Sequence, residues 1–449
     1  MAWLLTVGDE LLAGDIVDGN KARLAASARG LGLEVRRAVS VRDRQGEIVT
    51  ALREAAEHAH VCLVSGGLGP TTDDLTTAAV AEAAGRPLRR DPDAVLRLEE
   101  KFRRFGAPMP PANLKQAEFP EGAEILPNPV GSAEGLRCEL PGPLACQVFV
   151  MPGVPHELER MLAEQVAPRV HERFALRAVP RRVYRMIGLG ESAVAARVEP
   201  LVDRARERSP GLAAVYVHYR AHMPQVSVAL EAVPGPDGTQ ATLDELASLD
   251  ADLIEALTPA IYGIGEADLP ARIVTALTTA GLTFASAESC TGGGLGALVT
   301  SVSGSSACFR GGIISYDNDV KARLLGVPSD MLAAHGAVSE PVARAMALGA
   351  RRQLQSDLAA GITGIAGPGG GSPDKPVGTV HIAIADGEET FHKALLLRGT
   401  RGIVQAASAL WALKLLWDRL VSRGLATVST GGSTGGSTGA STGGATGDS

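Results

Sequence analysis

A repeated pattern of short apolar strands and amphipathic helices constrains the fold of the first 175 residues. Strands are predicted at Ala2–Val7, Val35–Val41 and His60–Ser65, and a further apolar run lies at Cys146–Val150. Apolar residues at helical spacing fill the intervals, as in Glu47–His58. Strands that alternate with helices form mostly parallel sheets with helices on both faces. The sequence therefore predicts an α/β/α sandwich for residues 1–175.

Glycine-rich turns follow several of these strands. Gly66-Gly67-Leu68-Gly69 comes after the third strand, and similar turns are expected at Asn128–Gly135 and Met151–Glu157. Glycines let backbone amides approach an anion closely, and a following helix adds a favourable dipole. Asp73 or Asp74 could hold a divalent ion that bridges phosphates. One such turn is equally well explained as a tight strand–helix connection, but three in one domain favour a phosphate site.

The bulk composition excludes several classes of function. The net charge is −7 and aromatic residues make up 4% of the 449, so neither a basic face nor a stacking surface for nucleic acid is indicated. The five cysteines form no C-x-x-C pair, and reduced thiols in a cytoplasmic protein are expected. The N-terminus lacks a positive leader, and no apolar run approaches the roughly 18 residues of a membrane span.

Residues 178–263 predict a small α+β module. A strand from Pro180 ends in Gly188-Leu189-Gly190-Glu191, and Ser192 can cap a helix over Ala193–Arg206. Strands at Ala213–Tyr219 and Gln225–Ala232 and a helix at Asp244–Leu257 follow. The Gly-Leu-Gly-Glu turn lacks the basic character of an RNA backbone clamp. We therefore interpret this module as a spacer or dimerisation unit.

A third α/β domain is predicted over residues 266–424. Its first helix begins after Asp268 and stops at Gly281, and a strand then delivers the turn Glu288–Gly294. If Thr291 caps the next helix, the first amides of that helix are free to bind an anion such as a nucleotide phosphate.

Lys321 is the candidate general base of this domain. Asp317 or Asn318 caps the predicted helix that carries it, which places Lys321 near the first turn. A cation beside the positive end of a helix should have a lowered pKa, and a neutral lysine can accept a proton as arginine cannot. Only 7 of the 43 basic residues are lysine, so a lysine here stands against the compositional trend.

Two adjacent serines are the candidate nucleophiles. Ser305 or Ser306 would be activated by Lys321, with Tyr316 as a relay, in a serine–lysine arrangement. Cys290 is the rival nucleophile, but a small buried thiol is the simpler interpretation because no Cys–His pairing is suggested by the spacing.

The first domain resembles the molybdopterin-binding-type domain that begins the CinA (competence/damage-inducible) proteins. The resemblance rests on Gly-Asp-Glu-Leu-Leu from Gly8, Ser-Gly-Gly-Leu-Gly-Pro-Thr from Ser65, Asn-Pro-Val-Gly-Ser-Ala from Asn128 and Pro-Gly-Val-Pro from Pro152. It implies hydrolysis of ADP-ribose with a divalent metal ion such as Mg²⁺. The implied metal-facing residues are Asp9, Asp74 and Glu157, and the implied ligand-cradling residues are Gly66, Gly67, Gly69 and Ser132. The chain differs at Glu134, where the family more often has proline.

The middle segment resembles the KH-like domain of the same family, and the third resembles the CinA C-terminal domain. The latter resemblance rests on Ala-Glu-Ser-Cys-Thr-Gly-Gly from Ala287, Gly-Ser-Ser from Gly304, Tyr316 with Lys321, and Thr-Gly-Ile-Ala-Gly-Pro from Thr363. It implies hydrolysis of the carboxamide of nicotinamide mononucleotide (NMN) without a cofactor. The implied catalytic residues are Ser305, Ser306, Tyr316 and Lys321. The implied substrate-binding residues are Glu288, Ser289, Thr291, Gly292, Gly293, Thr363, Gly364 and Arg401.

The expected protein is thus a bifunctional hydrolase of NAD salvage. It would deamidate NMN, cleave ADP-ribose to AMP and ribose 5-phosphate, and form a homodimer. The rival hypothesis is a non-enzymatic competence or DNA-damage accessory protein that binds partners or a pterin nucleotide. Residues 425–449 are a Ser/Thr/Gly repeat with no apolar residues to bury, and a disordered tail is expected there.

Overall fold

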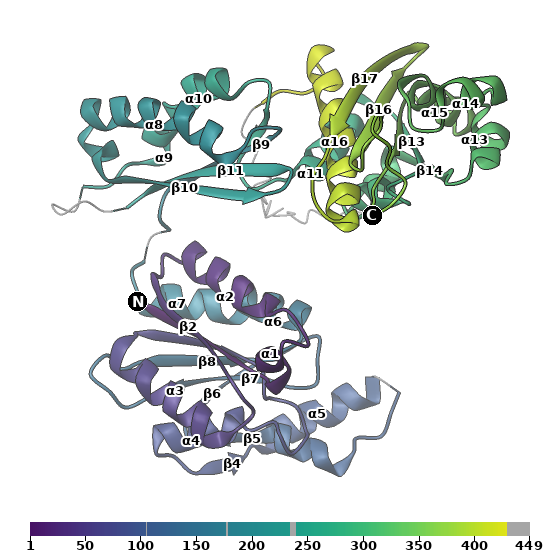
Figure 1. The fold of residues 1–449 in the computed structure, drawn as a ribbon. Coiled ribbons are helices and arrows are strands. Elements are labelled where there is room, and N and C mark those ends of the chain that lie inside the picture. The colour runs from purple at the N-terminus through teal and green to yellow at the C-terminus, as the bar shows by residue number, and fades with distance from the viewer. Residues whose placement is uncertain (105, 177, 234–238, 429–449) are drawn as a thin grey trace, which may run out of the picture. The chain divides into compact units, whose positions relative to one another are not determined.

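The chain has the predicted α/β class and divides into two compact units, Met1–Val179 and Pro180–Ser449 (Figure 1). The structure, a computed structural model, describes residues 1–104, 106–176, 178–233 and 239–428. The predicted tail therefore lies outside the described residues from 429 onward. Within the described ranges, no helix combines the length and apolarity needed to cross a membrane.

The first unit is built on a six-stranded sheet with the order β2-β1-β3-β8-β7-β6. Its first four strands in this order are parallel, and β7 and β6 are added antiparallel at one edge. The strands are β1 (Ala2–Val7), β2 (Val35–Val41), β3 (Val61–Ser65), β6 (Glu124–Leu126), β7 (Gly135–Glu139) and β8 (Gln147–Met151). A separate two-stranded ribbon pairs β4 (Leu88–Arg90) with β5 (Glu118–Pro120).

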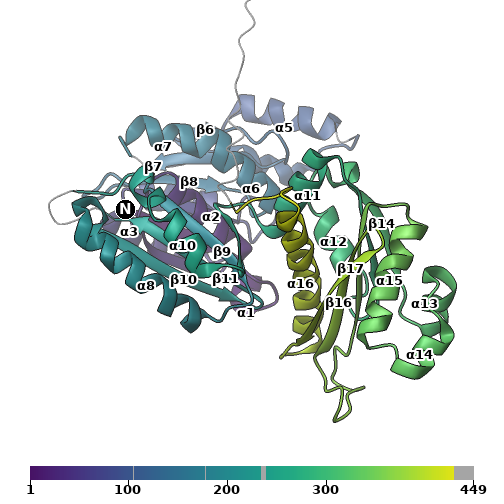
Figure 2. The same cartoon turned by 90° about the horizontal axis from the view of Figure 1, so that it is seen from above.

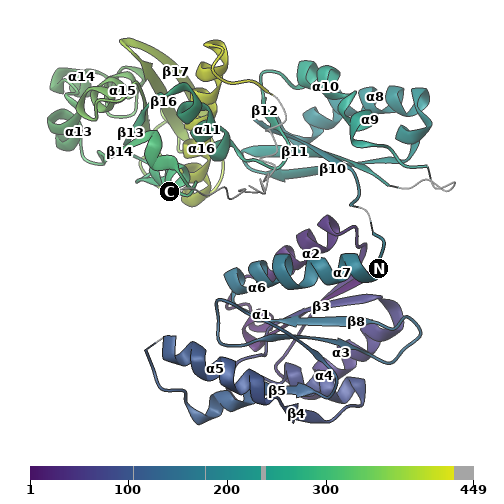
Figure 3. The same ribbon diagram turned by 180° about the vertical axis from the view of Figure 1, so that it is seen from behind.

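Helices cover both faces of this sheet, as the alternating pattern predicts (Figure 3). One apolar core lies under α3 and α4, through residues such as Ile48 and Val80, and another under α2 and α6, through Leu24 and Leu158. The helices are α1 (Asp9–Ala13), α2 (Gly19–Gly30), α3 (Gln45–His58), α4 (Thr76–Ala84), α5 (Pro92–Arg104), α6 (Pro155–Met161) and α7 (Ala167–Arg173), with a 3₁₀ helix η1 (Pro111–Ala117) and a π-helical turn η2 (Leu162–Val166).

The second unit begins with an antiparallel sheet of order β10-β11-β9-β12. Its elements are β9 (Arg181–Ile187), α8 (Glu191–Arg208), the 3₁₀ helix η3 (Pro210–Ala214), β10 (Val215–His222), β11 (Gln225–Ala232), α9 (Leu243–Ala247), α10 (Asp250–Leu257) and β12 (Ile261–Ile264). Two local predictions were wrong. Gly190, not Ser192, occupies the N-cap of α8, and the helix expected over Asp244–Leu257 is interrupted between α9 and α10.

A five-stranded sheet of order β14-β13-β15-β16-β17 completes the second unit (Figure 2). β14, β13 and β15 are parallel, whereas β16 and β17 are antiparallel. α11, α12 and α16 cover one face and α13 and α15 the other. The elements are α11 (Leu269–Ala280), β13 (Phe284–Glu288), α12 (Gly294–Thr300), the 3₁₀ helix η4 (Ser305–Ala307), β14 (Phe309–Ile314), α13 (Asn318–Leu325), α14 (Ser329–His335), α15 (Glu340–Gln353), β15 (Leu358–Gly364), β16 (Thr379–Asp386), β17 (Glu389–Leu396) and α16 (Arg401–Ser422).

Candidate active sites

A pocket of about 380 Å³ lies at the carboxyl ends of β1, β3 and β8 in the first unit. Open parallel sheets bind ligands at this edge. The structure brings six of the seven predicted residues of this domain to the pocket: Gly66, Gly67, Gly69, Asp74, Ser132 and Glu157. Asp9 lies outside the lining and is exposed, with its backbone N–H donating to Asp43 Oδ2 at 2.8 Å.

The glycine turn after β3 has a steric reason for its composition. Gly66 and Gly67 have φ values of 108° and 68°, in the left-handed region that favours glycine. A Cβ atom on Gly67 would lie 2.1 Å from Thr76 Oγ1, and one on Gly66 would lie 2.4 Å from Val7 O. Thr76 Oγ1 also donates to Gly66 O at 2.9 Å. The turn is therefore held tightly against the start of α4.

Three further carboxylates line this pocket, and the motif-based interpretation did not identify them as a group. They are Glu10, Asp43 and Asp73. Burial raises the pKa of Asp43, and the negative charges of Glu10, Asp9 and Asp73 raise it further. Asp43 follows the carboxyl end of β2, so its place at this edge could have been inferred from the strand pattern.

The predicted metal-facing carboxylates do not form a cage by themselves. Asp74 Oδ2 accepts from the backbone N–H of Thr71 at 2.8 Å, and Glu157 Oε2 accepts from Asn128 Nδ2 at 2.7 Å. Among the described residues, no three His, Cys, Asp or Glu side chains are grouped so that they could hold a metal ion. Mg²⁺ commonly takes only one or two carboxylates and completes its shell with phosphate oxygens and water, so a cage of three side chains is not a requirement of that ion.

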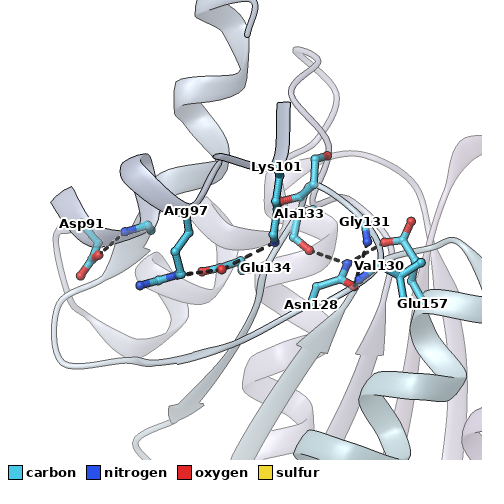
Figure 4. A network of polar contacts seen from close by, with 11 residues as sticks. Asp91, Arg97, Lys101, Asn128, Val130, Gly131, Ala133, Glu134 and Glu157 are labelled. Carbon is cyan, nitrogen blue, oxygen red and sulfur yellow. Dashed lines mark hydrogen bonds and ion pairs between the residues drawn. The ribbon is translucent and has the colours of Figure 1, made fainter. Parts of the chain in front are cut away.

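Glu134 is neutralised by its neighbours (Figure 4). Its side chain, 6% exposed, accepts two hydrogen bonds of 2.9 Å from Arg97 and lies 3.6 Å from Lys101 Nζ. Burial lowers the pKa of Lys101, and the Glu134 carboxylate opposes this shift. The negative charge of Glu134 is thus matched by two cations, Arg97 and Lys101.

The second candidate site lies at the carboxyl ends of β13, β14 and β15. These strands end at Glu288, Ile314 and Gly364 in the same direction. Arg401, the first residue of α16, reaches this edge, where Nη1 donates to Gly367 O and Nη2 to Tyr316 Oη, both at 2.9 Å. The edge thereby gathers Glu288, Tyr316, Thr363 and Arg401 from four separate parts of the chain.

Glu288 has a structural role that the sequence did not predict. Its carboxylate is 1% exposed; Oε2 accepts from the amides of Gly293 and Leu295, and Oε1 accepts from the amide of Gly296 and from Ser286 Oγ, at 2.9–3.2 Å. The N-cap of α12 is Gly293, not Thr291. The expectation that the first amides of this helix are free for a substrate anion was therefore wrong, because the chain's own carboxylate occupies them.

Lys321 is buried, with 1% of its surface exposed. Asp317 caps α13 as predicted, accepting from Asp319 N at 2.8 Å. Lys321 Nζ donates to Ser315 O at 2.8 Å and to Tyr316 O at 3.0 Å. Burial lowers the pKa of Lys321, whereas Asp317 and Cys290 raise it. The predicted direction is confirmed, but desolvation is the main cause and not the field of the helix.

Two buried hydroxyls at this edge have no hydrogen-bond partner within the described residues, namely Thr291 Oγ1 and Ser315 Oγ. Buried polar groups are nearly always paired, so these two are available to a ligand or to water. Thr363 Oγ1, in contrast, donates to Ala337 O at 2.8 Å. Gly364 is required for packing, because a Cβ atom there would lie 2.9 Å from Thr379 O.

The turn from Ser289 to Gly293 follows directly from β13. Ser289 N donates to Ile362 O and Gly292 N donates to Ser289 O, at 3.0 and 3.2 Å. Gly292 and Gly293 have φ values of 62° and 100°. These residues thus form the compact turn that presents Thr291 at the sheet edge.

Ser305 and Ser306 do not meet Lys321 within one chain. They lie in η4, before the first residue of β14, whereas Tyr316 and Lys321 follow its last residue. The six residues of β14 separate the two positions by about 16 Å at the rise of a β-strand. The predicted contact between either serine and Lys321 of the same chain was therefore wrong.

Cys290 is an inert thiol in this environment. Its side chain is buried, and burial raises the pKa of Cys290 to about 12. The thiolate is the reactive form of cysteine, so this shift argues against a nucleophilic role. The prediction that Cys290 packs in the interior is confirmed.

A histidine pair lies next to Thr363 on the same sheet. His381 is the cross-strand partner of Thr363, and its Nδ1 lies 3.0 Å from His392 Nε2. His392 Nδ1 lies 3.3 Å from Glu340 Oε2. Burial lowers the pKa of both imidazoles, and Glu340 opposes this shift.

Comparisons with known proteins agree with this division of the chain. Residues 3–172 match the family described as a probable molybdopterin binding domain, and residues 266–420 match the CinA C-terminal domain. A CinA-like protein of Anaeromyxobacter sp. (strain Fw109-5) is 43% identical over 92% of this chain and 97% of its own. A CinA-like protein of Geobacter metallireducens is 44% identical over 93% of this chain and 99% of its own.

Solved structures resemble single segments of the chain. The competence/damage inducible protein CihA of Agrobacterium tumefaciens is 41% identical, with 33% of this chain and 91% of its own covered and a TM-score of 0.33. The protein CinA of Thermoplasma acidophilum is 36% identical, with 38% and 96% covered and a TM-score of 0.35. Because the similarity to the two CinA-like proteins extends through both units at more than 40% identity, the chain belongs to the CinA-like family.

Proposed function

We propose that the second unit hydrolyses the carboxamide of NMN to nicotinate mononucleotide and ammonia. The proposal rests on one observation above all: the buried Lys321, whose pKa is lowered, donates to the carbonyl of Ser315 at 2.8 Å at the carboxyl end of β14, and the hydroxyl of Ser315 has no partner among the described residues. A lysine that titrates closer to neutral pH can accept and return a proton during acyl transfer. Arg401 supplies a positive charge at the same edge for the phosphate of the substrate.

The reaction follows serine–lysine chemistry. A serine hydroxyl attacks the carboxamide carbon as its proton passes to the neutral Lys321 amine. The carbon–nitrogen bond then breaks, and Lys321 returns the proton to the departing amide nitrogen, which leaves as ammonia. Water hydrolyses the resulting ester by the same proton transfers and regenerates the serine. Thr291 Oγ1 and Ser315 Oγ are candidate donors to the carboxamide oxygen, on which charge develops.

Ammonia release from NMN tests this proposal. Replacement of Lys321 by Met preserves the apolar stem and removes the base, so we expect a loss of about 10²–10⁴-fold in kcat. Lys393→Met, at an exposed position on β17, is the matched control and should retain activity. Absence of ammonia release by the wild-type protein, or full activity of Lys321→Met, would contradict the proposal.

We propose in addition that the first unit cleaves ADP-ribose, with water, to AMP and ribose 5-phosphate. The acidic lining of its pocket supports a role for a divalent ion, since the pyrophosphate of the substrate would otherwise face Glu10, Asp43 and Asp74. Such an ion, when bound, would neutralise the phosphate oxygens and polarise the reacting phosphorus. The tight glycine turn of Gly66 and Gly67 would position backbone groups around the same phosphates.

AMP formation from ADP-ribose in the presence and absence of Mg²⁺ tests this second activity. Asp74→Ala should abolish the Mg²⁺-dependent rate, because Asp74 both lines the pocket and holds the Thr71 turn. Asp93→Asn, on the exposed surface of α5, serves as the control. AMP formation that is independent of Mg²⁺, or that survives Asp74→Ala, would contradict the proposed role of the carboxylates.

A further inference from the structure

The first pocket is acidic, although its proposed substrate is an anion. Among the described residues that line it, none carries a positive charge and five carry a carboxylate, namely Glu10, Asp43, Asp73, Asp74 and Glu157. A bound divalent ion would offset part of this charge, but the pyrophosphate of the substrate brings further negative charge of its own. A cation close behind the lining would therefore favour binding.

Lys101, on α5, lies behind this lining (Figure 4). Its Nζ is 3.4 Å from the carbonyl oxygen of Ser132, which is a residue of the pocket, and its side chain is only 17% exposed. Burial lowers the pKa of Lys101, and the carboxylates of Glu134 and Glu157 oppose this shift. Glu157 itself lines the pocket, so the charge of Lys101 acts on a group inside it.

The cluster around Glu134 carries an excess positive charge. Arg97 donates from Nε and Nη2 to the two oxygens of this carboxylate, both at 2.9 Å. Lys101 Nζ is 3.6 Å from Oε1, beyond the range of a strong hydrogen bond. Two cations and one carboxylate thus leave one positive charge within the wall. Because Arg97 alone satisfies both oxygens of Glu134, this charge remains beside the Ser132 carbonyl.

The peptide group between Ser132 and Ala133 connects this charge to the pocket. The peptide is trans, so its C=O and N–H groups point in opposite directions, and the Ala133 N–H points away from the side on which Lys101 lies. Both Ser132 and Ala133 line the pocket, and Lys101 does not. Within the described part of the chain, the N–H of the buried Ala133 has no acceptor, and such donors are rare unless a ligand or water pairs with them. A cation at the carbonyl oxygen polarises the peptide and makes its N–H a stronger donor.

We propose that Lys101 is a positioning residue for phosphate binding at the first pocket, and that it acts through the peptide between Ser132 and Ala133. The Ala133 N–H donates to a phosphate oxygen, and the positive charge behind the peptide strengthens this hydrogen bond. This inference rests on the ADP-ribose hydrolysis proposed above and adds a source of positive charge for the pyrophosphate.

Binding of inorganic pyrophosphate to the full-length chain, measured by calorimetry at constant Mg²⁺ concentration and ionic strength, tests this inference. Lys101→Met keeps the apolar stem and leaves Glu134 paired with Arg97, so the fold should be retained. The Kd should rise about tenfold, as expected for unit charges roughly 10 Å apart at an effective dielectric constant of about 20, with some screening by salt. Lys101→Arg keeps the charge and should restore most of the affinity. Arg103→Gln removes one charge from the same helix at a side chain that is 74% exposed, and it should leave the Kd unchanged.

Two ligands of different charge separate this electrostatic role from a packing role. The ratio of the Kd of Lys101→Met to that of the wild type should be larger for pyrophosphate than for inorganic phosphate, which carries less charge. Equal ratios, an unchanged Kd in Lys101→Met, or a loss that Lys101→Arg does not restore would overturn the inference. Absence of pyrophosphate binding by the wild-type chain would overturn it as well.

AMP formation from ADP-ribose distinguishes failure of this inference from failure of the proposed hydrolysis. The same KM for ADP-ribose in Lys101→Met and in the wild type would reject the role of Lys101 and retain the hydrolysis. Pyrophosphate binding that depends on Lys101, in a chain that forms no AMP from ADP-ribose, would retain the role of Lys101 and reject the hydrolysis.

Discussion

Glu288 offers the sharpest test of how the second unit is held together. Its carboxylate accepts from three backbone amides at the start of α12 and from Ser286 Oγ. Replacement by Gln preserves the shape but leaves only one acceptor oxygen. The orientation that keeps most hydrogen bonds places that oxygen at the Oε2 position, where it accepts from the amides of Gly293 and Leu295. The new NH₂ group then faces the amide N–H of Gly296, and no hydrogen bond can form between these two donors.

The expected cost follows from these bonds. One buried amide loses its partner, at about 1–3 kcal/mol, and the two remaining bonds lose their ionic acceptor, at about 1 kcal/mol each. Loss of the negative charge at the helix N-terminus adds a few tenths of a kcal/mol or more. We therefore expect Glu288→Gln to destabilise the second unit by about 3–5 kcal/mol, which for a domain of this size lowers Tm by roughly 6–20 °C.

Tryptophan fluorescence can isolate the unit concerned. The chain has three tryptophans; Trp3 lies in the first unit, and Trp411 and Trp417 lie in α16. In a Trp3→Phe background, thermal unfolding followed by fluorescence therefore reports on the second unit. Glu389→Gln is the control, because that carboxylate is 74% exposed and 3.5 Å from Arg419, and it should shift stability by less than about 0.5 kcal/mol. If Glu288→Gln matches this control in stability yet abolishes NMN hydrolysis, Glu288 contacts substrate and the structural interpretation is refuted.

Three further predictions concern buried titratable groups. Iodoacetamide at pH 8 should leave all five cysteines of the native chain unmodified and label them after unfolding, because burial raises the pKa of each thiol; rapid labelling of the native protein would disprove this. The pKa values of His381 and His392 are lowered in the folded state, so these imidazoles bind protons more readily in the unfolded chain. The free energy of unfolding should therefore fall as the pH drops below about 6.5. The slope is at most about 1.4 kcal/mol per pH unit for each proton. His392→Gln should reduce this slope in pH-dependent unfolding, and the exposed His222→Gln should not. Glu134→Gln should destabilise the first unit by about 1–3 kcal/mol, since it leaves the half-buried Lys101 without a counter-ion, and adding Lys101→Met should recover part of the loss in denaturant unfolding.

Local chemistry made much of the fold predictable. Asp268 and Asp317 accept from backbone N–H groups at the starts of α11 and α13, and Gly281 ends α11 in the left-handed conformation, as the sequence indicates. The alternation of apolar strands and helices likewise gives the parallel core of both α/β sheets. These features depend on residues within a few positions of one another, which a sequence displays directly.

The composition of the sites was harder to predict, because it depends on where strands begin and end. Ser306 and Lys321 are 15 positions apart in sequence, and that proximity suggested a contact that the length of β14 prevents. Asp43 joins the first pocket from a strand distant in sequence from the glycine motifs. The Glu288 carboxylate accepts hydrogen bonds from the amides at the start of α12. Residue type alone does not predict this contact, since a carboxylate at a glycine turn is equally suited to bind a ligand.

The tight turn at Gly66 and Gly67 has a consequence for the thermodynamics of binding. Its contacts with Val7 and Thr76 fix the backbone in the unliganded chain. The conformational entropy of this loop is therefore lost when the protein folds and not when a ligand arrives. Association at the first pocket should require little backbone rearrangement, and differences in affinity among related phosphate ligands should arise mainly from their dissociation rates.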